Sequence, residues 1–96
     1  MGDEIIATRK YEIVDEGGVK SPLLIHLFKP VPDGDDWRCK VEIHEKGNVW
    51  PHSVVGIDAL QALNIAITRI KSEVFSFQKL YKGGFEFLDQ QDELWV

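Results

Sequence analysis

The single cysteine, Cys39, and the three histidines are the residues that could supply a thiol nucleophile with an imidazole base. A reactive thiolate needs an accessible, electropositive setting. Cys39 instead falls in an alternating run, on the same side as Val41 and Ile43, whereas His44 falls on the opposite side. The pattern therefore predicts a buried, structural thiol.

The histidines, acids and glycines do not match motifs for metals or phosphates. The sequence has no His-x-x-x-His or Cys-x-x-Cys pair, and a calcium loop starting at Asp33 would place Trp37 and His44 where oxygen ligands are required. The glycine pairs lack the spacing of phosphate-binding loops. None of the sixteen acids has the apolar context of a general acid. We assign no catalytic residue, metal site or cofactor, and favour a protein that is not an enzyme.

Arg9 is the charged residue in an otherwise apolar row. In a regular strand it shares a side with Ile5, Ala7, Tyr11 and Ile13. An unpaired charge there would be costly. Two interpretations follow: the guanidinium reaches water or a carboxylate at a sheet edge, or it forms an anion or partner site.

Two other groups of residues are candidates for a partner surface. The acidic turn contains Asp33, Asp35 and Asp36, which form either a solvated turn or a docking patch for a basic partner. Ile65 and Phe75 lie off the main apolar stripe of the predicted helix, so they are candidates for self-association or partner binding.

Composition limits the class of protein. The 96 residues carry sixteen acids and eleven bases, and a formal net charge of −5 opposes binding to nucleic acid. No apolar run is long enough to span a membrane, and acids stand where a secretory signal would be basic. We expect a cytoplasmic single domain over residues 1–96, without nucleic-acid or membrane partners.

The elements that position these residues follow from periodicity. Residues 4–14, 23–28 and 37–43 are predicted strands. The prolines in residues 30–36 predict a surface loop, and residues 49–55 are a fourth candidate strand that Pro51 confines to an edge or a bulge. Phe85–Phe87 and residues 93–96 are further short candidates.

Asp58 and Gln61 have the spacing of a capping box, which predicts a helix starting near Ala59 and stopping at Gly83-Gly84. Its predicted apolar stripe consists of Leu60, Leu63, Ile67, Ile70, Val74, Phe77 and Tyr81. The predicted fold is α+β: an antiparallel meander of three to four strands packed against one long helix, with a short C-terminal strand as an optional addition.

Four segments together resemble an uncharacterised family of small bacterial proteins, a domain of unknown function: Ile6-Ala7-Thr8-Arg9, Phe28-Lys29-Pro30, Asp35-Asp36-Trp37-Arg38-Cys39 and Gly56-Ile57-Asp58-Ala59-Leu60-Gln61-Ala62-Leu63. The resemblance spans roughly residues 5–75. Lys40 stands where the family commonly has proline, and the tail from Phe85 matches nothing. The resemblance implies the same fold and a cytoplasmic bacterial protein, and it carries no activity or site residues.

We expect a non-catalytic protein-interaction or accessory module that binds a protein partner or itself. An immunity-type inhibitor of a basic toxin is a special case, because acidic side chains steer such encounters. The alternative is a small-molecule-binding or enzymatic domain with a groove between helix and sheet and Arg9 as anion anchor. A deep pocket containing Arg9 favours the alternative, and a flat apolar patch favours the interaction module.

Overall fold

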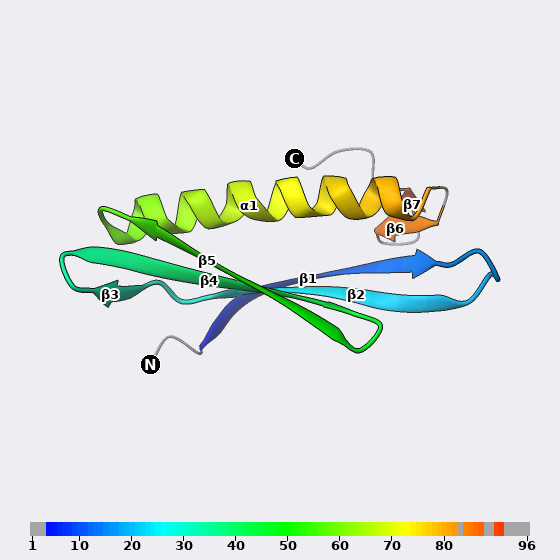
Figure 1. The fold of residues 1–96 in the computed structure, drawn as a ribbon, viewed down its shortest axis with the longest axis horizontal. Helices are drawn as coiled ribbons and strands as arrows, with labels where there is room; N and C mark the ends of the chain where they lie inside the picture. The colour runs from blue at the N-terminus through cyan, green and yellow to red at the C-terminus, as the bar shows by residue number, and fades with distance from the viewer. Residues whose placement is uncertain (1–3, 83, 88–89, 92–96) are drawn as a thin grey trace.

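The computed structural model describes residues 4–82, 84–87 and 90–91. Its elements are β1 (Ile5–Val14), β2 (Lys20–Phe28), β3 (Val31–Asp33), β4 (Asp36–Glu45), β5 (Asn48–Gly56), α1 (Ala59–Leu80), β6 (Phe85–Phe87) and β7 (Gln90–Gln91). Figure 1 shows α1 lying along one face of a twisted sheet. The α+β class and the single long helix are confirmed for these residues.

The described part of the chain forms a seven-stranded antiparallel sheet, more strands than the three to four expected. Its centre is the meander β1, β2, β4 and β5, in the spatial order β5-β4-β2-β1. The additional strands are short: β3 pairs with β4, and β6 and β7 continue the sheet beyond β1. β5 pairs with β4 alone among the described strands, so the edge position expected from Pro51 is confirmed.

The loop predicted for residues 30–36 is wrong at residues 31–33, which form β3. This strand pairs antiparallel with the first residues of β4. Pro32 is tolerated because β3 lies at the edge of the sheet, where a missing N–H removes no required ladder bond. Gly34 has a φ of 64°, which closes the turn between the two strands.

The regular alternation predicted for residues 4–14 also fails near its start. The register of β1 against β2 shifts between Ile5 and Ala7, which places Ile5 opposite Phe28. This bulge moves Ile5 off the side occupied by Tyr11. Within β1 only Tyr11 and Ile13 are buried.

The helix begins as the sequence predicts. The Asp58 side chain accepts a hydrogen bond from the Gln61 N–H at 2.8 Å, and Gln61 Oε1 accepts one from the Ile57 N–H at 2.7 Å. At the other end, the Tyr81 N–H donates to the Phe77 carbonyl oxygen at 2.9 Å. The capping box predicted for Asp58 and Gln61 at the start of the helix is therefore confirmed.

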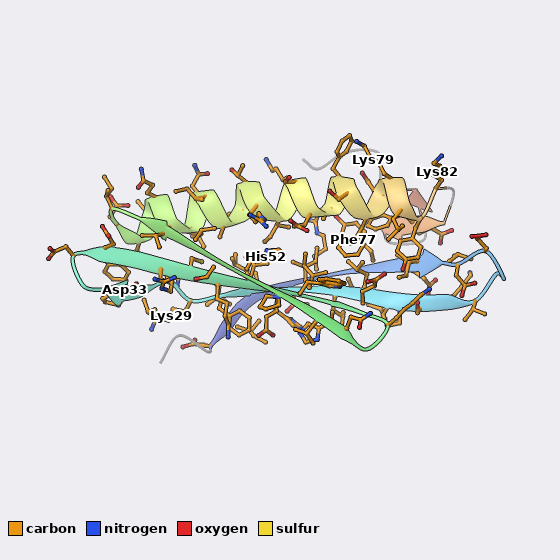
Figure 2. All side chains as sticks on the ribbon, viewed as in Figure 1. Lys29, Asp33, His52, Phe77, Lys79 and Lys82 are labelled. Atoms are coloured by element: carbon orange, nitrogen blue, oxygen red, sulfur yellow. The ribbon has the colours of Figure 1, made fainter. Side chains whose placement is uncertain are left out.

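The core lies between α1 and the face of the sheet that it covers. Figure 2 shows Phe77 pointing from α1 toward the sheet and Lys79 pointing away from it. The buried residues of the helix are Ala62, Ala66, Ile70 and Val74. The sheet contributes Tyr11, Ile13, Leu23, Ile25, Cys39, Val41 and Ile43.

Leu60 was predicted in the core stripe, and this is wrong because its side chain is 78% exposed. The reason is the close approach of the helix to the end of β5. A Cβ atom added at Gly56 would lie 2.4 Å from the Ala62 nitrogen, so the first turn rests directly on the strand. Leu60 precedes Ala62 by two residues, about 200° around the helix, and therefore points to solvent.

Candidate functional site

Cys39 is fully buried, as predicted. Its thiol donates a hydrogen bond to the Phe28 carbonyl oxygen at 3.4 Å, and burial raises the pKa of the thiol. A protonated, inaccessible thiol is a poor nucleophile. The position suits packing.

The acidic turn divides into two parts. Asp33 Oδ2 accepts hydrogen bonds from Arg38 Nε at 2.9 Å and Nη2 at 2.6 Å, and Arg38 Nη1 donates to Ser53 Oγ at 3.0 Å. Arg38 on β4 therefore links Asp33 on β3 to Ser53 on β5. Asp35 and Asp36 are exposed.

The other predicted surface residues do not form one site. Arg9 is half-buried and its Nη1 lies 3.5 Å from the Tyr11 hydroxyl, to which it donates. Ile65 and Phe75 are both exposed on α1, ten residues or about 15 Å apart along its axis. The tail tryptophan, Trp95, which could have joined them, lies outside the described residues.

A buried carboxylate at the end of β4 was missed by the sequence analysis. Glu45 is 7% exposed, and its carboxylate accepts hydrogen bonds from the Tyr81 hydroxyl and from Trp50 Nε1, the latter at 3.3 Å. Burial is the largest cause of a raised pKa at Tyr81, which reaches about 12. The hydrogen bond to Glu45 and the negative charge of that carboxylate raise the pKa further. The signal was available in the sequence, since Glu45 continues the inward-facing alternation of Cys39 and Ile43.

A groove of about 680 Å³ lies beside Tyr81, where the last turn of α1 meets the β1–β2 turn. We call it the end groove. Lys46 Nζ lies 3.8 Å from Asp15 Oδ2 and 5.3 Å from the centre of the Tyr81 ring. Asp15 Oδ1 accepts from the N–H groups of Gly17 and Val19. These contacts hold the end of the helix against the two turns, and the groove carries both signs of charge.

On the face of the sheet away from α1, polar side chains connect β1, β2 and β4. Thr8 Oγ1 lies 3.1 Å from His26 Nδ1, and the His26 ring packs edge-on against His44 with centres 4.9 Å apart. Glu42 lies within 3.1 Å of His44 Nε2 and 3.4 Å of Lys40 Nζ. Among the described residues no cluster of His, Cys, Asp and Glu has the geometry to hold a metal ion. This network braces neighbouring strands.

The outer edge of β5 is guarded. Pro51 has no N–H to donate, and proline in a strand is tolerated where its nitrogen faces away from the neighbouring strand. Arg69 on α1 donates to His52 Nδ1 at 2.9 Å and to Glu73 Oε2 at 3.0 Å. Figure 2 shows His52 between β5 and the helix. These features protect this edge against an added strand.

The outer edge of β1 is different. β1 pairs with β2 along its whole length, but with β6 only at Glu12 and Ile13. From Ile5 to Lys10 the outer side faces no strand among the described residues, and we call this segment the free β1 edge. In Figure 1 the first half of β1 diverges from α1.

Backbone groups along the free β1 edge point outward. The Val14 N–H donates to the Gly84 carbonyl oxygen at 2.7 Å, on the side of β6. Successive residues of a strand alternate, so the N–H and C=O groups of Thr8 and Lys10 face that same side. Ile5 and Ile6 are 46% and 45% exposed beside them. The edge combines open hydrogen-bonding groups with apolar side chains.

A family model described as a domain of unknown function, DUF6968, matches residues 7–95. The chain belongs to the DUF6968 family. The predicted resemblance to an uncharacterised domain is thereby confirmed. No curated protein and no solved structure matches the chain.

Among the described residues of this DUF6968 chain, three features are candidates for binding: the end groove, the exposed acids of the β3–β4 turn and the free β1 edge. Arg9 lines neither the end groove nor the hollow of about 260 Å³ beside the β4–β5 turn. No helix in the described residues is long and apolar enough to cross a membrane. Of the three features, the free β1 edge offers the most directional contacts, because main-chain hydrogen bonds fix both register and direction.

Proposed function

We propose that this DUF6968 chain is a non-catalytic protein-interaction module that accepts an extended segment as an added strand on the free β1 edge. The observation that carries the proposal is that β6 pairs with β1 only at Glu12 and Ile13, so the outward groups of Thr8 and Lys10 face no strand among the described residues. An added strand would pair with these groups. Ile5 and Ile6 would lose exposed apolar surface on binding.

A synthetic peptide copying residues 4–11, labelled with fluorescein, tests this proposal. We expect it to bind the folded protein at micromolar to millimolar concentration, measured by anisotropy at low protein concentration. Thr8→Pro should abolish binding, because it removes an outward N–H donor and no main-chain bond to β2; it also removes the side-chain contact of Thr8 with His26. Circular dichroism and thermal melting establish that the variant is folded.

The matched control is Ser53→Pro, which places the same change on the guarded β5 edge. Ser53 lies two residues from Pro51 and shares its orientation in the strand. This variant should bind the peptide as the wild type does. Equal binding by wild type and Thr8→Pro, or no binding at any concentration up to about 1 mM, would overturn the proposal.

A special case within this function is an immunity-type inhibitor of a basic partner, supported by the exposed Asp35 and Asp36. Replacing both by asparagine should slow association with such a partner and leave thermal stability unchanged. Asp33→Asn should instead lower stability by up to about 1 kcal/mol, because it weakens a half-exposed pair with Arg38. Thermal unfolding of the variants separates the two roles.

The second candidate function is small-molecule binding, supported by the end groove rather than by Arg9. Its mixed charges, with Lys46 and Lys82 beside Asp15 and Glu16, suit a ligand that carries both signs. A thermal-shift screen of zwitterionic compounds, repeated with Lys82→Ala, tests it. A stabilisation that Lys82→Ala leaves unchanged would count against this site.

A further inference from the structure

We propose that a second surface, around the start of α1, binds a basic, amphipathic segment of a partner protein. This surface consists of two apolar anchors and two acids: Ile57, Leu60, Asp35 and Asp36. We call it the helix-start surface. The inference rests on the basic-partner case of the proposed function, which involved the acids alone, and it adds the apolar contacts that position the partner.

Ile57 and Leu60 are the two most exposed large apolar side chains among the described residues, at 72% and 78%. Neither supports the core: Ile57 precedes the Asp58 cap, and Leu60 is turned outward by the contact of Gly56 with Ala62. A single exposed apolar side chain is ordinary at a protein surface, but two of them at one helix start form an apolar patch. Folding makes little use of these side chains, so a partner that covers them gains their burial.

The register of β4 and β5 brings the acids to this apolar pair. The outermost pair of the ladder is Trp37 with Gly56, and Asp36 and Ile57 are the next residues outward on the two strands. Figure 1 shows the β3–β4 turn and the start of α1 at the same end of the molecule. Exposed carboxylates therefore lie beside exposed apolar side chains, and an apolar centre with a charged rim is typical of protein interfaces.

The sign of the charge at this end selects the partner. Asp33 is paired with Arg38, so the exposed Asp35 and Asp36 add two negative charges that this pair does not neutralise. Figure 2 shows Lys29 on the side of β3 that faces away from α1. A basic segment is therefore attracted to the helix-start surface, and its apolar side chains can then cover the two anchors.

Other occupants fit this end less well. The Asp58 carboxylate, which accepts from the Gln61 N–H, offsets the positive end of the α1 dipole, so the surface keeps its negative charge. Nucleic acid and anionic lipid are therefore repelled. A second copy carries the same net charge of −5, and two such ends would bring acid against acid. A basic amphipathic segment matches both the charge and the apolar pair.

A fluorescein-labelled helical peptide of about 14 residues, with leucine on one face and lysine on the other, is the probe. It should bind the full chain with a dissociation constant below about 1 mM, measured by anisotropy. Leu60→Ser and Ile57→Ser should each weaken binding about tenfold, because each removes an apolar contact. Replacing Asp35 and Asp36 together by asparagine should flatten the salt dependence of binding.

The matched controls change one property at a time. Val19→Ser removes an apolar side chain that is 61% exposed in the β1–β2 turn, which lies at the other end of the molecule in Figure 1. This variant should bind the peptide as the wild type does. A second peptide with glutamate in place of lysine should not bind, because its charge has the same sign as the acids. All the replaced side chains are exposed, so thermal melting should show every variant folded.

The outcomes separate this inference from the function on which it rests. Binding of the basic peptide that Leu60→Ser and Ile57→Ser leave unchanged would overturn the inference and keep the acids as the contact. No binding up to about 1 mM would overturn both the inference and the basic-partner case, whereas the free β1 edge is tested separately by the peptide of residues 4–11. Equal binding of the glutamate peptide, or self-association of the chain that Leu60→Ser abolishes, would refute a basic partner at this surface.

Discussion

Tyr81→Phe removes one hydroxyl from the contact that joins the end of α1 to the sheet. The Tyr81 hydroxyl donates to the Glu45 carboxylate, which is buried and also accepts from Trp50. A hydrogen bond to a charged group contributes about 1.5–3 kcal/mol, and a buried carboxylate that loses a donor also loses part of its solvation. We therefore expect a loss of about 2 kcal/mol at pH 7, or a fall in Tm of about 8–16 °C for a domain of this size.

The pH dependence follows from the raised pKa of Tyr81, about 12 against an ordinary value of 10.0. A group whose pKa is raised on folding contributes stability that is fully present below pH 10 and is lost as the pH rises through 12. The two-unit shift corresponds to at most about 2.7 kcal/mol, and partial exposure of the ring reduces this to about 1 kcal/mol. The advantage of the wild type over Tyr81→Phe should accordingly shrink between pH 10 and pH 12.

Urea unfolding of the wild type, Tyr81→Phe, Glu45→Gln and the double variant at pH 7 and pH 11.5 measures these effects. The double-mutant cycle isolates the interaction between the two side chains. Additive losses at pH 7 would refute the inferred energetic contact. A difference between wild type and Tyr81→Phe that stays constant up to pH 12 would refute the assigned cause of the pKa shift.

Ile70→Asp should leave the chain unfolded or aggregated, because it buries an unpaired carboxylate in a domain with a total stability of about 5–15 kcal/mol, whereas Ser72→Asp on the exposed face should melt like the wild type. Equal melting temperatures for the two would contradict the packing of α1. Cys39 should react slowly with a thiol reagent in the native protein and fast in urea; rapid native labelling at neutral pH would restore the nucleophile hypothesis. Gly56→Ala should lower stability by more than about 1 kcal/mol, since its methyl group would collide with the Ala62 backbone, and unchanged urea unfolding would disprove the close approach.

Local sequence patterns accounted for the elements whose residues lie close together in the chain. Alternation located β4 and the burial of Cys39, and the Asp58 cap with the three-four spacing located α1. These features depend on side-chain direction within one element, which the backbone period fixes. The free β1 edge could not be derived in this way, because it exists only through the place where β6 stops.

Tertiary structure decided the features that depend on register and on docking between distant segments. Leu60 fits the apolar period of α1, yet the contact of Gly56 with Ala62 turns it to solvent. Ile5 fits the alternation of β1, yet a bulge against β2 moves it to the other face. Glu45 is buried at the end of β4, where its carboxylate accepts hydrogen bonds from Trp50 and from Tyr81, 36 residues later. The sequence by itself therefore determined the helix and the long strands of the meander, since their periods follow from neighbours in the chain, but not the short strand β3. Which edge stays unpaired among the described strands was decided by the pairing of strands remote in sequence, because the positions of their ends are set by contacts that no local pattern encodes.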